Sequence, residues 1–129
     1  MDTTLPKRIL IVDDEAGFTR LLKLTLEGTK RYIVKEENDG SQAIFAARSF
    51  HPDLVLLDIV MPKMDGGDVA RQISGDPTLK ETKIIFLTAI VSQKEAGAGG
   101  IGGFPFMAKP VSLAALTDMI EKTLQPPAE

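Results

Sequence analysis

The stretch DLVLLDIVMPKMDG, Asp53 to Gly66, carries the strongest indication of the fold in this chain. Its first six residues, 53–58, place four consecutive apolar side chains between two aspartates. A short apolar run with polar ends is typical of a strand that is covered on both faces, as in a parallel sheet. The runs RILIV at 8–12 and KIIFLTA at 83–89 have the same character. The sequence therefore predicts a sheet with buried central strands.

Helical patterns separate these strands. After the first strand, apolar residues recur at steps of three and four, which predicts a helix that ends near Gly28. The other expected elements are a more polar edge strand at 31–37, helices at 41–49 and 67–75, a fifth apolar strand at 104–108, and a last helix from the N-cap Ser112 to about Leu124. Strict alternation of strands and helices predicts an open α/β sheet with right-handed crossovers.

The composition fits one globular domain. The chain has 129 residues, 43% of them hydrophobic and 26% charged, with a net charge of −3. We expect a single domain over 1–129 with its core at about 7–124, and a tail or the start of a linker at 125–129. A mildly acidic chain gives no basic face for nucleic acid. With no signal peptide pattern and no run of about 20 apolar residues, we expect a cytoplasmic protein that contacts neither nucleic acid nor membrane directly.

Acidic and polar residues follow the predicted strands where the strands end. The first strand is followed by Asp13-Asp14-Glu15, the third ends in Asp58, the fourth in Thr88, and Lys109 follows the fifth. In an open α/β sheet the functional crevice lies at the carboxyl ends of the strands. Clustered carboxylates need a counter-charge, and Mg²⁺ prefers such oxygen ligands. This pattern predicts phosphoryl chemistry with Asp58 as an aspartyl-phosphate acceptor. The alternative is that these aspartates are helix N-caps or solvated turn residues.

The motifs ILIVDDE, DLVLLDIVMPKMDG, IIFLTA and KP, in this order and spacing, resemble the receiver domain of two-component response regulators. The resemblance covers about 7–124 and implies a flavodoxin-like, five-stranded sheet of order 2-1-3-4-5. It implies that Asp58 is the phosphoacceptor and that Mg²⁺ is held by Asp14 directly, by Asp13 through water, by Asp58 and by the backbone carbonyl of Val60. The resemblance also implies a hydroxyl switch at Thr88, a phosphate-pairing Lys109, a small residue at Ala89, a switch aromatic at Phe106 and a cis bond before Pro110.

The function that the resemblance implies is a signalling switch in a phosphorelay, and not an enzyme acting on an external substrate. A sensor histidine kinase or phosphotransfer protein would donate a phosphoryl group to Asp58. The face formed by the last two strands and the helices that follow them would then signal to an unknown downstream protein. In receiver domains, the residues two past the acceptor and two past the threonine influence the water that hydrolyses the aspartyl-phosphate. Here these residues are Val60 and Ile90, which are apolar and cannot orient water. We therefore expect slow self-dephosphorylation.

The segment Gly97–Gly103 contains a G-x-G-x-x-G pattern, but it neither follows a strand directly nor opens a helix, which argues against a dinucleotide site. Five glycines there predict that the usual fourth helix is short or disordered, with at most a turn or two around 92–96. We expect this segment either to become ordered with phosphorylation or a partner, or to be a flexible loop.

Two other functions fit the sequence less well. A haloacid-dehalogenase-like phosphatase would need a second aspartate at position 60, which is Val60. A phosphorylation-independent interaction module with the same fold is the remaining alternative. The lone His51 is expected to be a surface turn residue, and Met61 and Met64 are expected to pack the loop beside the acceptor.

Overall fold

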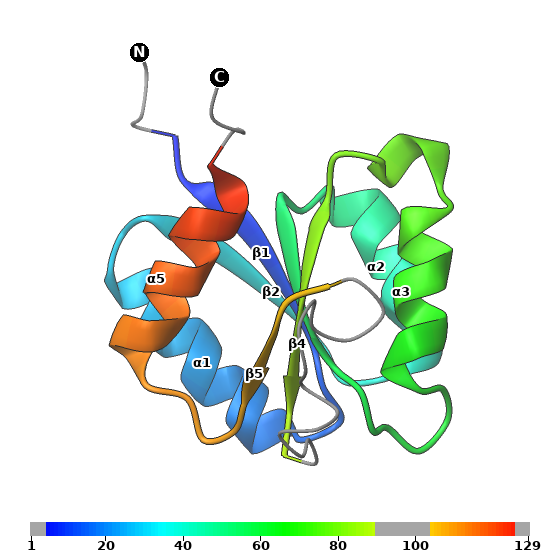
Figure 1. Cartoon of the computed structure of the whole chain (residues 1–129), viewed down its shortest axis with the longest axis horizontal. Coiled ribbons are helices and arrows are strands. Elements are labelled where there is room, and N and C mark those ends of the chain that lie inside the picture. The colour runs from blue at the N-terminus through cyan, green and yellow to red at the C-terminus, as the bar shows by residue number, and fades with distance from the viewer. Residues whose placement is uncertain (1–4, 90–103, 126–129) are drawn as a thin grey trace.

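The computed structural model describes residues 5–89 and 104–125, with Thr88 described by its backbone alone. Within these residues the chain forms strands and helices in alternation, as the sequence predicts (Figure 1). The elements are β1 (Lys7–Val12), α1 (Ala16–Gly28), β2 (Tyr32–Glu37), η1 (Gly40–Gln42), α2 (Ala43–Phe50), β3 (Leu54–Asp58), α3 (Gly66–Ser74), η2 (Pro77–Leu79), β4 (Lys83–Thr88), β5 (Phe106–Ala108) and α5 (Leu113–Leu124).

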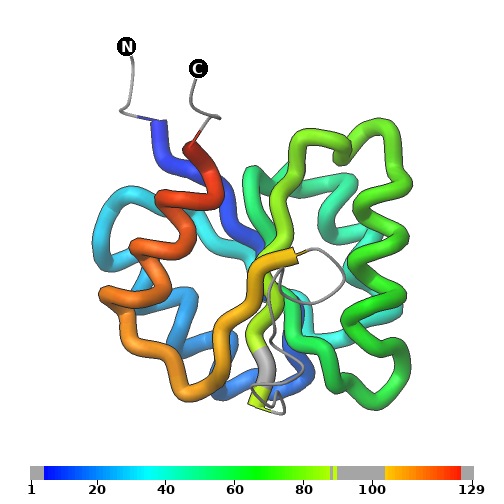
Figure 2. Tube along the Cα trace, in the orientation of Figure 1, coloured from blue at the N-terminus to red at the C-terminus, as the bar shows by residue number. Residues whose placement is uncertain are grey.

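The strands form one parallel sheet of order β2-β1-β3-β4-β5, which confirms the expected flavodoxin-like topology. β2 lies at one edge, as its polar sequence predicts. The expected short fourth helix and the glycine-rich segment 97–103 lie outside the described residues. In the tube trace of Figure 2 the start of β1 and the end of α5 lie near each other, far from the carboxyl ends of the strands.

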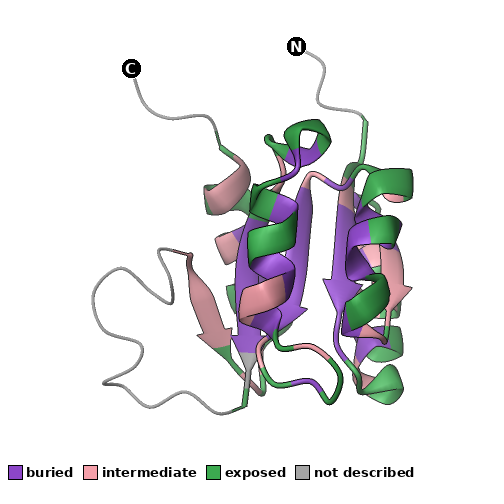
Figure 3. Cartoon of the chain, turned by 90° about the vertical axis from the view of Figure 1, so that its right-hand side faces the viewer, coloured by how far each residue is buried: buried purple, intermediate pink, exposed green. Residues whose placement is uncertain are grey.

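Helices cover both faces of the sheet. α2 and α3 pack on one face and α1 and α5 on the other (Figure 1). Successive residues of a strand point to opposite faces, so Leu10 and Val12 join the first layer while Ile9 and Ile11 join the second. All five residues of β3 are buried, as the run at 53–58 predicts (Figure 3). This double covering explains why the interiors of the central strands are apolar, with polar residues only at their ends.

Local signals in the sequence place the helix ends. Ser112 caps α5 through a hydrogen bond from the Ala115 amide to its hydroxyl, and Asp65 caps α3 in the same way. His51 ends α2 in the left-handed conformation, with φ 54°, and is exposed, which confirms its assignment to a surface turn.

Candidate functional site

Three carboxylates meet at the carboxyl edge of the sheet. Asp13 and Asp14 follow β1, and Asp58 is the last residue of β3, the neighbouring strand. One carboxylate oxygen from each lies within 4.8 Å of the others. Asp13 and Asp58 are buried, whereas Asp14 is exposed. Oxygen ligands in this arrangement suit Mg²⁺, which is held by one or two carboxylates and keeps several waters.

Lys109 is brought to this cluster from the chain segment after β5. Its ammonium lies 2.6 Å from Asp13 Oδ2, 3.1 Å from Glu15 Oε1 and 3.8 Å from Asp58 Oδ2. The same nitrogen lies 4.3 Å from the centre of the Phe18 ring. The peptide bond that follows, Lys109–Pro110, is cis, as expected. The structure thus brings together the acids and the lysine that the sequence analysis singled out.

The electrostatics of the site follow from this geometry. Burial, and then the neighbouring Asp13 carboxylate, raise the pKa of Asp58 to about 6. Burial alone would lower the pKa of Lys109, but its hydrogen bonds to Asp13 and Glu15 raise the pKa above the ordinary value. The cluster therefore contains more negative charge than one lysine compensates, which favours the binding of a further cation.

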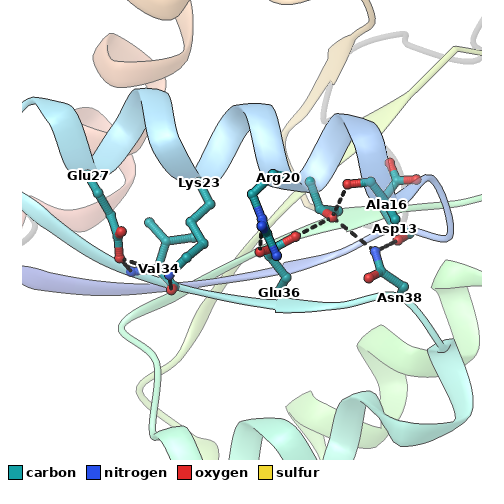
Figure 4. Close-up of polar contacts among 9 residues, drawn as sticks. Asp13, Ala16, Arg20, Lys23, Glu27, Val34, Glu36 and Asn38 are labelled. Atoms are coloured by element: carbon teal, nitrogen blue, oxygen red, sulfur yellow. Dashed lines mark hydrogen bonds and ion pairs between the residues drawn. The ribbon is translucent and has the colours of Figure 1, made fainter.

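Asn38, just after β2, fixes the main chain of the acid pair (Figure 4). Its side-chain amide donates to the Asp13 carbonyl at 2.7 Å and to the Thr19 hydroxyl at 3.0 Å. Thr19 is buried and donates to Glu36 Oε1 at 2.9 Å. Further along α1, the Lys23 ammonium donates to the Val34 carbonyl on the edge strand β2. The Val34 amide in turn donates to the Glu27 carboxylate. A row of polar contacts between α1 and β2 thus leads to the acid pair.

The loop after β3 lies against the Asp58 carboxylate. The Val60 amide donates to Asp58 Oδ1 at 3.4 Å, and Val60 is 53% exposed. Gly66 closes the loop, and its amide donates to the Ile59 carbonyl at 2.7 Å. A Cβ at Gly66 would lie 2.3 Å from the Asp58 carbonyl oxygen, so this position requires glycine. Met61 is buried and Met64 packs against the same core, which confirms their expected packing role.

A groove of about 190 Å³ opens beside Asp14. It lies between the loop after β2 and the loop after β3, and Lys63 crosses it to lie 3.5 Å from Asp39. The groove gives Asp14 access to solvent. The acid cluster is therefore reachable from outside even though Asp13 and Asp58 are buried.

The switch residues expected from the resemblance are placed by their strands. Asp58 at the end of β3 is in register with Leu87, so Thr88, the last residue of β4, lies one position further toward the same edge. Ala89 follows and is exposed. Phe106 is half-buried on β5 and packs against the core on the α2–α3 side. Ile90 lies outside the described residues.

The alternative explanation of the acids as helix caps does not match the structure. Glu15, and not Asp13 or Asp14, occupies the N-cap of α1, and Asp65 caps α3. Asp13 instead accepts hydrogen bonds from Lys109 and from the Glu15 amide. None of the three aspartates of the cluster therefore caps a helix, whereas the exposed Asp14 fits the other part of that alternative, a solvated residue in the turn between β1 and α1.

Four residues of the site were not singled out by the sequence analysis: Glu15, Phe18, Asn38 and Gly66. Gly66 ends the quoted stretch DLVLLDIVMPKMDG, so the sequence did show a glycine in the loop that follows the Asp58 strand. Glu15 belongs to the acid run but was not given a separate role. Phe18 follows the helical apolar pattern, and Asn38 lies in a turn, so neither carries a local pattern that points to the site.

Fold and site together define a flavodoxin-like α/β domain with an acid pocket and a lysine at the carboxyl edge of its sheet. Residues 9–121 match the family described as the response regulator receiver domain. The chain belongs to this family, which serves two-component signalling rather than the turnover of an external substrate. Receiver domains bind Mg²⁺ in this acidic pocket and interact with histidine kinases.

Curated relatives include the transcriptional regulatory protein ResD of Bacillus subtilis, 45% identical over 69% of this chain and 35% of its own length. The DNA-binding response regulator MtrA of Mycobacterium tuberculosis is 38% identical over 87% of this chain and 49% of its own. The chain thus spans a third to a half of the length of these relatives. Because MtrA is a DNA-binding regulator, the comparison gives no support to the expectation that this protein meets no nucleic acid.

Solved structures show the same architecture. A receiver domain of the sensor histidine kinase PA1611 from Pseudomonas aeruginosa, with magnesium coordinated in its active site cleft, is 26% identical with a TM-score of 0.79 over 93% of this chain and 98% of its own. The BeF3-activated receiver domain of Klebsiella pneumoniae RstA is 27% identical with a TM-score of 0.78 over 92% of this chain and 99% of its own. No helix within 5–89 or 104–125 is long and apolar enough to cross a membrane.

Proposed function

We propose that this receiver domain accepts a phosphoryl group on Asp58 from a phosphohistidine of a sensor kinase or phosphotransfer protein. The observation that carries this proposal is the position of Asp58, whose buried carboxylate lies beside the acid pair with the Lys109 ammonium 3.8 Å away. The expected cytoplasmic location and an unknown downstream protein are part of the same proposal.

Mg²⁺ would be held by Asp14 and Asp58, by Asp13 through water, and by the backbone carbonyl of Val60. The structure supports an indirect role for Asp13, because Lys109 and the Glu15 amide already occupy one oxygen each. The exposed Asp14 lines the groove, from which a cation could reach its carboxylate. When bound, the cation supplies positive charge that neutralises oxygens of the transferred group.

In the transfer, a carboxylate oxygen of Asp58 forms a bond to phosphorus as the bond from phosphorus to the histidine nitrogen breaks. The histidine leaves with the bonding electron pair, and the product is an acyl phosphate on Asp58. Lys109 would donate a hydrogen bond to a phosphoryl oxygen, which stabilises its negative charge. The Val60 amide orients the attacking carboxylate through Asp58 Oδ1.

The readout would begin at Thr88, which we expect to hydrogen-bond the phosphoryl group. Thr88 and Phe106 lie on the paired strands β4 and β5, so we expect a displacement of Thr88 to change the position of Phe106. The face of β4, β5, α5 and the segment 90–103 would then change its preference for a downstream protein. The part of this face in 90–103 lies outside the described residues.

The test is the intact mass of the protein after incubation with a small acyl-phosphate donor and Mg²⁺. We expect one added phosphoryl group in the wild type and none in Asp58→Asn or without Mg²⁺. No addition to a folded wild-type protein would overturn the proposal and favour a phosphorylation-independent interaction module.

A further inference from the structure

Glu15 occupies the N-cap of α1 without using its side chain as a cap. Its carbonyl accepts the Thr19 amide, but the Glu15 side chain makes no capping hydrogen bond among the residues described. Asp, Asn, Ser and Thr are the residues that cap well, because their short side chains reach back to the helix amides. The longer side chain of Glu15 is therefore available for another contact.

That contact is the Lys109 ammonium, which lies nearer to Glu15, at 3.1 Å, than to Asp58, at 3.8 Å. The two side chains of the Lys109–Glu15 ion pair differ in exposure to solvent: that of Lys109 is 11% exposed, and that of Glu15 is 65% exposed. Asp13, at 2.6 Å, is the third acceptor and is almost fully buried. A lysine ammonium has three donors, and these three carboxylates surround it.

We propose that Glu15 is a positioning residue that holds Lys109 back from the acceptor in the unphosphorylated chain and competes with the incoming phosphoryl group. This inference rests on the proposed function. A phosphoryl oxygen on Asp58 needs a donor from Lys109, so the ammonium must weaken one of its present contacts. Asp13 cannot return to water because it is buried, and the Phe18 ring occupies a further side of the ammonium. Glu15 can return to water and is the contact that is given up.

The test uses beryllofluoride with Mg²⁺ as the phosphoryl probe, titrated against the full chain and followed by ¹⁵N-resolved NMR. Glu15→Gln removes the charge. Glu15→Asp keeps the charge but shortens the side chain, which then caps α1 instead of reaching Lys109. Glu81→Gln, an exposed position next to the amino end of β4, makes the same charge change at the opposite end of the sheet.

We expect both Glu15 variants to bind the probe about two- to fivefold more tightly than the wild type, and Glu81→Gln to bind like the wild type. Unchanged or weaker binding by Glu15→Gln would overturn the inference. Tighter binding by Glu15→Gln with wild-type affinity in Glu15→Asp would also overturn it, since local charge and not the contact would then be responsible.

A second readout separates this inference from the proposed function. If the wild type does not bind the probe at all, the proposed function fails, but the ammonium resonance of Lys109 still reports on the contact. In the unliganded protein we expect this resonance to shift, and its hydrogen exchange to accelerate, in Glu15→Gln and Glu15→Asp. A resonance identical to that of the wild type in both variants would overturn the positioning role.

Discussion

The Lys109 ammonium lies 2.6 Å from Asp13 Oδ2 but 3.8 Å from Asp58 Oδ2. The positive charge of Lys109 therefore compensates the Asp13 carboxylate, which follows β1, more strongly than it compensates the carboxylate of Asp58, the expected phosphoacceptor. Asp58 is left buried with incomplete compensation, and its pKa is raised to about 6. The stability of the domain and its response to cations follow from this imbalance.

Asp58→Asn is expected to stabilise the protein without divalent cations at pH 7. The raised pKa of Asp58 means that its protonated form is favoured in the folded state. The stability that protonated Asp58 contributes to the folded state is fully present below its unfolded pKa near 3.8 and is lost as the pH rises through about 6. We expect a gain of about 1–2 kcal/mol in the free energy of unfolding after allowance for solvent screening. Urea unfolding in EDTA at pH 7 and pH 4 would measure it, and a gain that is as large at pH 4 would contradict this explanation.

Mg²⁺ is expected to stabilise the wild type and to have little effect on Asp14→Asn. A cation that binds only the folded state adds about 2.7 kcal/mol at a hundredfold excess over its dissociation constant. Asp14 is the exposed acid of the cluster, so its substitution should leave the packing intact. Unfolding in Mg²⁺ and in EDTA would show the difference. An equal Mg²⁺ effect in both proteins would place the cation elsewhere.

Asn38→Ala is expected to weaken Mg²⁺ binding and to lower stability by about 1 kcal/mol, because the Asp13 carbonyl loses its hydrogen bond from Asn38. Thr19→Val is the matched control, since it removes a neighbouring buried hydroxyl but keeps the bond from Asn38 to Asp13. Calorimetric titration with Mg²⁺ would compare the two. A similar loss of affinity in both variants would show that the effect comes from general loosening of α1.

Gly66→Ala and Gly17→Ala are expected to change stability in opposite directions. A Cβ at Gly66 would lie 2.3 Å from the Asp58 carbonyl oxygen and 2.8 Å from Ile59 Cα, so the loop must shift, at a cost of about 1–3 kcal/mol. A Cβ at Gly17, inside α1, meets no atom within 4 Å and should add about 0.5–1 kcal/mol through helix propensity. Thermal unfolding would measure both, and a neutral Gly66→Ala would mean that the loop is not fixed by this contact.

Val60→Asn is expected to speed the loss of the phosphoryl group from Asp58. Val60 is half-exposed two residues after Asp58, and its apolar side chain cannot hold a water there. An amide at this position can donate to and accept from water and should raise the decay rate severalfold. Intact mass followed over time after removal of the donor would give the rate. Decay at the wild-type rate would assign the water to other residues, among which Ile90 lies outside the described part of the chain.

Much of the fold follows from local patterns. The stretches 9–12, 54–57 and 84–87 are apolar at every position because both faces of their strands are covered, and Ser112 marks a helix start by its own capping chemistry. The polar character of 31–37 likewise indicates an edge strand, which β2 is. The strand order itself came from the resemblance to receiver domains, since local patterns do not determine which strands are neighbours.

The acids and the lysine were also predictable from sequence, because each follows a strand and parallel strands end at one edge of the sheet. The sequence alone determined which residues reach this edge. Only the tertiary structure decided how close the Lys109 ammonium lies to the carboxylates of Asp13, Glu15 and Asp58. These residues are 96, 94 and 51 positions away from Lys109 along the chain. The division of the lysine's charge among them depends on differences of about an ångström between side-chain atoms. Such differences arise from how β1, β3, β4 and β5 are aligned side by side in the sheet and have no local pattern in the sequence.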